Sequence, residues 1–380
     1  MKVGFDITPH YANRMTGAGR VVAGYARALS RVPDGPELVL IGFKENFVGL
    51  DDLPPQRVER RLLKREQLLG PAAEEVGRWR GVRRFGARDR IDLYHANLEL
   101  TLPGHGIPVV YHLYDLARLD PQVRHSNRSL RARIRTRLRY GLAERSDLIV
   151  TISQASRDDI ARRLQIDPTR IRVIHPGVEE RFFEIPRKRQ ALVLRRYGLS
   201  AGYVLFVGQL GRQKNESVLL EAWERTSSRF PDTKLVFAGD SSNALPGFGL
   251  RAARLDTEIL GRVADEDLPS LIAGAGVLVL ISTNEGFGLP VAEALAAGTP
   301  VIVGNRGALP EVAGDAGLIV DSDDVQGLSN ALTELLTGPE CAARLSELAL
   351  RRGREFRWER AAAQMIELYR ELLQSKAKTR

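Results

Sequence analysis

The sequence has only one cysteine, Cys341, so the 380-residue chain cannot form an internal disulfide. It has no group of Cys and His residues at the spacing of zinc ligands. The longest apolar runs, such as residues 277–281, are too short to cross a bilayer, and no apolar signal segment follows Met1. These absences exclude a disulfide scaffold, a zinc module and an integral membrane protein, and they predict a reducing, cytoplasmic location.

Lys and Arg outnumber Asp and Glu, which gives a net charge of +9, and the excess is concentrated in two Arg-rich segments, 57–90 and 124–145. Three interpretations stay open for these segments. They can be solvated helix faces, or they can contact an anionic membrane surface, because basic amphipathic helices bind such lipid. Nucleic acid is the third, and we do not expect it as a partner, because the segments contain no known reader motif.

The chain is long enough for two domains, and its apolar fraction of 43% is typical of well-filled cores. Strand-like and helix-like segments alternate, which predicts parallel sheets covered by helices. Residues 184–199 interrupt this alternation with charged residues and Pro186. We therefore expect a first domain at 1–185, a second at 200–356, and a C-terminal helix at 357–380 that packs toward the first domain. Strands are expected at 2–7, 38–43, 92–95, 109–113, 148–152 and 172–174, and then at 203–207, 235–238, 258–260, 277–281, 300–303 and 317–320.

The segment 284–293, Asn-Glu-Gly-Phe-Gly-Leu-Pro-Val-Ala-Glu, carries the strongest chemical signal. A buried strand is predicted before it, and Pro290 suits the first turn of a helix. A helix N-terminus attracts anions, and Gly286 and Gly288 allow a diphosphate to approach the backbone closely. Glu293 then lies one turn into the helix, within reach of ribose hydroxyls, and Glu285 precedes the phosphates, where a sugar ring would lie.

This segment resembles the E-x7-E segment of retaining GT-B glycosyltransferases, and especially of glycosyltransferase family 4. Glu285 and Glu293 match the two motif acids, and residues 286–290, 298–301 and 310–317 match the sequences usual in that family. The resemblance covers most of the chain. It implies an α/β protein of the GT-B fold, with two Rossmann-like parallel-sheet domains facing across a cleft.

The resemblance also implies a reaction. A hexose would pass from a UDP- or GDP-sugar to an acceptor hydroxyl with retention of configuration, and without a metal or other cofactor. GDP-mannose is the favoured donor, because the first domain resembles mannosyltransferases. The acceptor would be a component of cell-envelope polysaccharide, glycolipid or a related glycan, with a lipid-linked acceptor and peripheral attachment at the inner face of the cell membrane as a hypothesis.

Site residues follow from the same resemblance. The family places an Arg and a Lys after the first strand of the second domain to neutralise the diphosphate. Lys214 matches that Lys, and we assign the Arg role to Arg212, since Gln209 and Gln213 occupy positions where Arg is often seen. Glu285 would orient the donor sugar. Residues expected to contact the donor are Gly17, Gly19, Gly208, Val263, Gly286, Phe287, Gly288, Leu289 and Glu293.

The first domain departs from the family at one catalytic position. The family usually has a His immediately before Asp115, where this chain has Tyr114, while His112 lies two residues earlier. Either Tyr114 or His112 could contact the donor sugar, and a structural histidine is an equal alternative for His112. Two rival functions remain: a sugar phosphorylase of the GT-B fold, and a non-catalytic protein that binds sugar or nucleic acid.

Overall fold

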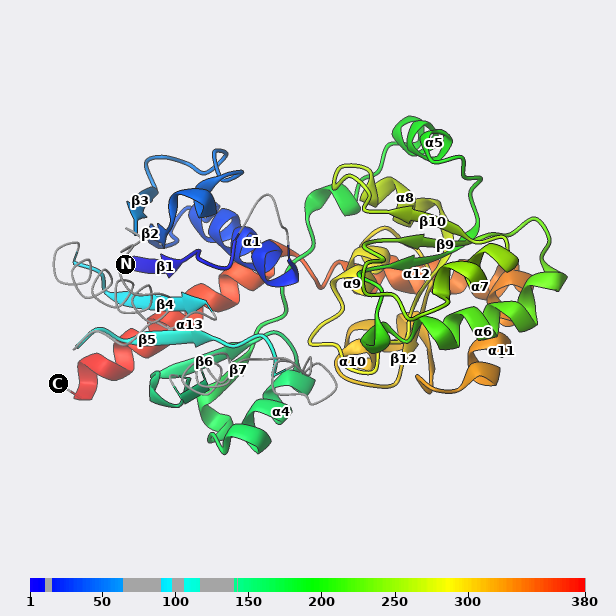
Figure 1. Cartoon of the computed structure of the whole chain (residues 1–380). Helices are drawn as coiled ribbons and strands as arrows, with labels where there is room; N and C mark the ends of the chain where they lie inside the picture. The colour runs from blue at the N-terminus through cyan, green and yellow to red at the C-terminus, as the bar shows by residue number, and fades with distance from the viewer. Residues whose placement is uncertain (11–15, 64–89, 98–105, 117–139, 142, 380) are drawn as a thin grey trace. The chain divides into compact units, whose positions relative to one another are not determined.

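The computed structural model describes residues 1–10, 16–63, 90–97, 106–116, 140–141 and 143–379, and it divides the chain into two compact units (Figure 1). The first unit contains Met1–Gly177 and Trp358–Arg380, and the second contains Val178–Arg357. The division falls after Gly177, so residues 178–185, which we expected in the first domain, belong to the second unit. The charged interval contains helix α5 (Arg187–Arg196) of that unit, and the chain passes between the units after Gly177 and again after Arg357.

The first unit contains a parallel sheet of seven strands in the order β3-β2-β1-β4-β5-β6-β7. Its strands are β1 (Lys2–Asp6), β2 (Glu37–Gly42), β3 (Val58–Leu62), β4 (Leu93–Asn97), β5 (Val109–His112), β6 (Leu148–Thr151) and β7 (Ile171–Val173). Its helices include α1 (Gly17–Arg31), α4 (Gln154–Leu164) and α13 (Trp358–Thr379), with the 3-10 turns η2 (Lys44–Phe47) and η4 (Pro168–Arg170).

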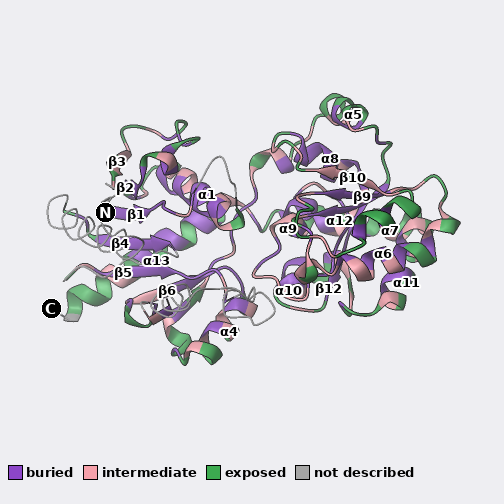
Figure 2. Cartoon of the chain, viewed as in Figure 1, coloured by how far each residue is buried: buried purple, intermediate pink, exposed green. Residues whose placement is uncertain are grey.

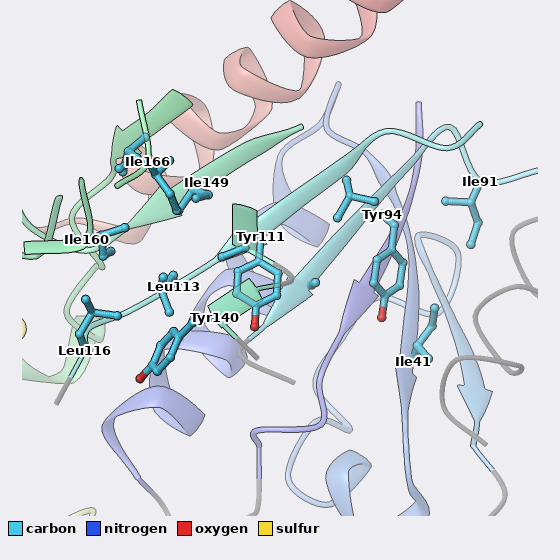
Figure 3. Close-up of a cluster of buried hydrophobic side chains, with 14 of the residues drawn as sticks. Ile41, Ile91, Tyr94, Tyr111, Leu113, Leu116, Tyr140, Ile149, Ile160 and Ile166 are labelled. Atoms are coloured by element: carbon cyan, nitrogen blue, oxygen red, sulfur yellow. The ribbon is translucent and has the colours of Figure 1, made fainter. Parts of the chain in front are cut away.

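Strand β3 was not expected from the sequence. It lies at the edge of the sheet, and its side chains are half-buried or exposed, so charged residues are tolerated there. The central strands are buried, as the purple ribbons of Figure 2 show. One part of the core gathers Tyr94, Tyr111, Ile149 and Ile160 around the sheet (Figure 3). Buried apolar side chains from several strands thus hold this unit together.

The two segments of the first unit meet at Trp358, the first residue of α13. A Cβ added at Gly24 of α1 would lie 2.0 Å from the Trp358 ring, and one added at Gly177 would lie 2.5 Å from it. Only glycine at both positions leaves space for the indole. In the second unit, the N–H of Val178 donates to the carbonyl of Phe356 over 2.7 Å, so the chain enters and leaves that unit side by side.

The second unit contains a parallel sheet of six strands in the order β10-β9-β8-β11-β12-β13. Its strands are β8 (Tyr203–Val207), β9 (Leu235–Ala238), β10 (Glu258–Gly261), β11 (Ala275–Leu280), β12 (Val301–Gly304) and β13 (Gly317–Val320). Its helices, besides α5, are α6 (Glu216–Thr226), α7 (Phe248–Arg254), α8 (Leu268–Gly274), α9 (Leu289–Ala296), α10 (Leu309–Ala313), α11 (Val325–Thr337) and α12 (Pro339–Gly353), with the 3-10 turns η5 (Glu180–Phe182), η6 (Arg212–Lys214), η7 (Ser227–Arg229) and η8 (Gly314–Ala316). Both units are therefore Rossmann-like, as predicted.

Candidate functional site in the second unit

The strand order of the second unit identifies one favourable place for a ligand. From β8 the chain proceeds outward through β9 and β10, and from β11 it proceeds through β12 and β13 in the other direction. β8 and β11 are neighbours, so the order reverses between them. In open α/β sheets, ligands bind outside the carboxyl ends of the strands at such a switch point. The loops after β8 (208–215) and β11 (281–288) both lie at that edge.

These two loops are hydrogen-bonded to each other through Gln213. Its side-chain Nε2 donates to the carbonyl of Asn284 over 2.8 Å, and its own carbonyl accepts from the N–H of Thr283 over 2.9 Å. Asn215 extends the connection, because its Nδ2 donates to the carbonyl of Ser322 over 2.5 Å. We assigned no role to Gln213 or Asn215 from the sequence. The departure from Arg at position 213 was a signal for Gln213, because a neutral amide side chain can donate to the neighbouring loop while the backbone carbonyl of the same residue accepts from that loop.

Lys214 and Glu285 form an ion pair across the switch point. The Lys214 Nζ lies 2.6 Å from Glu285 Oε2, and the two side chains are only 20% and 18% exposed. The backbone carbonyl of Glu285 accepts from the N–H of Ala308 over 2.9 Å, which fixes the loop from a third side. The structure thus brings together the two residues that the sequence assigned to phosphate binding and sugar orientation.

Helix α9 begins beside this pair. Gly288 precedes it with φ of +92°, a conformation that favours glycine, and Pro290 lies in its first turn. No acidic residue occupies that turn, so the positive end of the helix dipole is not offset there. Glu293 lies one turn beyond Leu289 on the same face, and its side chain is buried, with 5% of the residue exposed. This arrangement can accept an anion at the helix start.

The other predicted donor residues of the second unit lie at the same edge of the sheet or support it. Arg212 is exposed, and the structure gives its side chain no hydrogen bond to any residue that it describes. Gly208 directly follows β8, and the Lys214 side chain lies 3.8 Å from where its Cβ would be. Phe287 is buried and its ring packs edge-on against Phe356, so only its backbone can face a ligand.

The loop after β10 contains Val263, which is half-buried. Its neighbour Arg262 forms an ion pair with Asp240, whose carboxylate lies 2.9 Å away after strand β9. The hydrogen bonds from Ser242, and then Arg262, lower the pKa of Asp240 to about 2, so this carboxylate stays charged. The sequence did not single out Asp240, because its partner is 22 residues away in the chain.

In the first unit, Gly17 and Gly19 begin helix α1. The Thr16 hydroxyl caps this helix by accepting from the N–H of Gly19 over 3.1 Å. Gly17 is exposed and Gly19 is buried. The helix start therefore presents backbone amides at Gly17, at the carboxyl edge of its own sheet.

His112 is wholly buried, within a cluster that the sequence did not reveal. Its Nδ1 lies 3.3 Å from Nε2 of His95, whose Nδ1 lies 2.5 Å from the Tyr369 hydroxyl of α13. Burial lowers the pKa of His112 to about 3 and lowers that of His95 well below its usual value. His112 thus lies in the interior of the unit, which favours the structural alternative for this residue over contact with a sugar.

Tyr114 stacks on the His112 ring with centroids 4.4 Å apart, and its hydroxyl donates to Asn97 Oδ1 over 3.0 Å. Only 4% of Tyr114 is exposed, and burial raises its pKa well above the usual value, so it stays a neutral phenol. Tyr114 follows β5, near the carboxyl edge of the sheet, and its catalytic role stays a prediction.

Within the described ranges, no group of three or more His, Cys, Asp and Glu side chains is arranged to hold a metal ion. None of the helices that the structure describes is both long and apolar enough to cross a bilayer. The two Arg-rich segments lie mostly outside the described residues, in 64–89 and 117–139.

Comparisons with known proteins agree with the fold and identify the family. The sequence profile of the glycosyl transferases group 1 matches residues 199–352, and that of Glycosyltransferase Family 4 matches residues 15–182. The chain is similar to O-antigen chain mannosyltransferase B of Escherichia coli, with 34% identity over 59% of this chain and 60% of that protein. It is also similar to D-inositol 3-phosphate glycosyltransferase of Corynebacterium glutamicum, with 31% identity over 70% of this chain and 67% of that protein.

Solved structures share the fold at low sequence identity. HepE from Anabaena, crystallised with UDP, superposes with a TM-score of 0.74 at 20% identity over 98% of this chain and 100% of that one. Sucrose-phosphate synthase from Thermosynechococcus elongatus superposes with a TM-score of 0.77 at 20% identity, over 99% and 100% of the two chains. With both profiles, these relatives and these folds in agreement, the chain belongs to the group 1 glycosyltransferases of family 4 and has the GT-B fold.

Proposed function

We propose that this glycosyltransferase moves a hexose from a UDP- or GDP-sugar to an acceptor hydroxyl with retention of configuration. The observation that carries the proposal is the Lys214–Glu285 pair, 2.6 Å apart, at the switch point of the second sheet and beside the start of α9. A diphosphate needs cations and amides, and a sugar needs a hydrogen-bond acceptor close by. Both requirements are met within one site.

The chemistry assigned to the site is stabilisation of the leaving group. As the bond between the sugar and the diphosphate breaks, negative charge grows on the departing oxygen. That charge would be stabilised by Lys214, Arg212 and the amides of Gly288 and Leu289. In many enzymes, such electrostatic stabilisation makes the largest contribution to the rate enhancement. Glu285 would hold the sugar hydroxyls and its developing positive charge, and Glu293 would hold the ribose. In a front-face substitution, the leaving oxygen would take the proton of the acceptor.

Mannose is the hexose that we favour, because the E. coli relative is named a mannosyltransferase. The relatives also motivate a cell-envelope glycan or glycolipid as the product, since that protein acts on O-antigen chains by its name. Gly17 and Gly19 of α1 would approach the donor phosphates, and Tyr114 would take the place of the family's His. The proposal includes no metal ion and no organic cofactor.

The decisive experiment is a donor screen that detects released nucleoside diphosphate, followed by analysis of the anomeric configuration of the product. Thermal shifts with UDP, GDP and ADP identify the base, and equal shifts would remove the preference for GDP. Release of nucleotide that depends on acceptor supports the transfer reaction. Cleavage by inorganic phosphate without nucleotide would instead identify a phosphorylase, and inverted product would refute retention.

Lys214→Ala is expected to lower turnover by about a hundredfold or more while the protein stays folded, because one stabilising charge is lost in the transition state. Lys234→Ala provides the matched control. Lys234 also forms an ion pair in the second unit, with Glu258, but that pair lies between β9 and β10, away from the switch point. Near-normal turnover of Lys214→Ala, or an equal loss in both variants, would refute the role of Lys214.

We also propose a cytoplasmic protein that attaches peripherally to anionic lipid through the Arg-rich segments 57–90 and 124–145, where a lipid-linked acceptor would be found. Basic segments are attracted to anionic headgroups, and the attraction weakens as salt rises. Sedimentation with vesicles of anionic and of neutral phospholipid at low salt tests this. Equal sedimentation with both kinds of vesicle, or none with either, would refute it.

A further inference from the structure

The Lys214–Glu285 pair has a consequence for the order of binding and release. In the free protein, Lys214 is already neutralised by a carboxylate 2.6 Å from its Nζ. Gln213 links the two loops through hydrogen bonds of 2.8 and 2.9 Å, which keep Lys214 and Glu285 close to each other. Any anion that reaches Lys214 therefore meets the charge of Glu285 at close range.

The low exposure of the pair strengthens this effect. Solvent and salt screen partly buried charges less than exposed ones. A diphosphate placed on Lys214 gains one cation and is repelled by one carboxylate. Arg212, which is exposed, offsets only part of that repulsion because water screens it more strongly.

The donor and the product differ in what they offer Glu285. A nucleotide sugar brings hydroxyl groups, which donate hydrogen bonds to a carboxylate and occupy it. The nucleoside diphosphate that leaves after transfer has lost the hexose, so its terminal phosphate would face Glu285 directly, and that phosphate carries an additional negative charge. The same residue thus attracts the donor and repels the product.

Building on the proposed function, we propose that Glu285 discriminates the nucleotide-sugar donor from the nucleoside diphosphate product by competing with the product for Lys214. Glu285 then has a second role beside holding the sugar: it weakens product binding and speeds release. The discrimination depends on the charge of Glu285 and on the presence of Lys214.

Isothermal titration of the full-length protein with a nucleoside diphosphate and with the matching nucleotide sugar tests the inference. Glu285→Gln keeps the shape of the side chain and removes its charge. We expect it to bind the nucleoside diphosphate about fivefold more tightly than the wild type, the upper range for a partly exposed ion pair. Its affinity for the nucleotide sugar should stay equal or fall, because the carboxylate acceptor is lost.

Two further variants make the result specific. When Glu285→Gln is added to Lys214→Gln, the affinity for the nucleoside diphosphate should rise by less than half as much as it does in the wild-type background. Without Lys214, Glu285 has no cation for which it competes with the diphosphate. Glu258→Gln, which removes the carboxylate from the Lys234 pair, should leave both affinities unchanged. A full gain in the double variant would overturn the competition for Lys214.

The outcomes also separate this inference from the proposed function. If wild type and Glu285→Gln bind the nucleoside diphosphate equally, the discrimination is refuted while donor binding stands. If Glu285→Gln tightens both ligands by the same factor, Glu285 does not discriminate between them. If no variant binds nucleotide or nucleotide sugar, the proposed function itself is wrong.

Discussion

The buried His112 predicts that the first unit loses stability in mildly acidic solution. In the folded chain its pKa is lowered to about 3 by burial, whereas the value in an unfolded chain is 6.5. As the pH falls below 6.5, the unfolded chain takes up a proton at this residue and the folded chain does not. The stabilisation is therefore complete above the unfolded pKa and is lost as the pH falls toward the folded pKa.

The magnitude follows from these two values. Between about pH 7.5 and pH 5, the proton taken up by the unfolded chain lowers the free energy of unfolding by about 2 kcal/mol for this one histidine. His95, which lies against His112, shifts in the same direction and adds to the loss. The sequence of the second unit, Val178–Arg357, contains no histidine, so the effect belongs to the first unit.

Hydrogen exchange measured by mass spectrometry can follow each unit separately, through peptides that cover β4 and β5 in the first and β8 and β11 in the second. The free energy of opening should fall with pH in β4 and β5 more steeply than in β8 and β11. His112→Gln retains a hydrogen-bonding side chain but cannot be protonated, so its profile should lose about 2 kcal/mol of pH dependence over that range. Parallel profiles for the variant and the wild type would refute the reasoning, whatever their absolute stabilities.

Two other predictions concern packing and hydrogen bonding. Gly288→Ala is expected to destabilise the second unit by about 1–2 kcal/mol and to weaken nucleotide binding, because Gly288 has φ of +92° and the added Cβ would lie 2.7 Å from Leu309. Gly198→Ala is the control, since Gly198 has φ of +66° but open space, and equal thermal shifts for both would contradict the prediction. Tyr369→Phe should cost about 1–3 kcal/mol in urea unfolding, because His95 Nδ1 loses its partner at 2.5 Å. Tyr25→Phe should leave the free energy of unfolding nearly unchanged, since the Tyr25 hydroxyl is buried without a hydrogen-bond partner in the described parts of the chain. A similar loss of stability in both variants would refute the contribution of the Tyr369 hydrogen bond.

Local patterns predicted most of the fold. Strand β8 is an apolar run between Gly202 and Gly208, and β11 is an apolar run that begins after Gly274, so both patterns are visible without any long-range information. Edge strand β3 was missed because its residues Val58–Leu62 include two arginines, and only its neighbour β2 makes that segment a strand. Helix α5 was missed for a related reason, since its charged sequence resembles a linker and its buried Val193 and Leu194 are few.

The site was predictable where the chemistry is local and not where it depends on tertiary contacts. Glu285 and Lys214 could be named because each lies in a motif with its own glycines. Their direct pairing could not, because it joins residues 71 positions apart. The same holds for the cluster around His112, because His112 contacts His95, and His95 contacts Tyr369, which lies 274 positions further along the chain.

The path of the chain through the two units has a consequence for synthesis on the ribosome. All of Val178–Arg357 emerges before α13, so the second unit has its complete sequence while the first still lacks its last helix. Until α13 has been translated, Gly24 lacks its contact with the Trp358 ring, and His95 Nδ1 lacks the Tyr369 hydroxyl. The first unit can therefore take its complete fold only after all of the second unit has been translated, although its own sequence begins first.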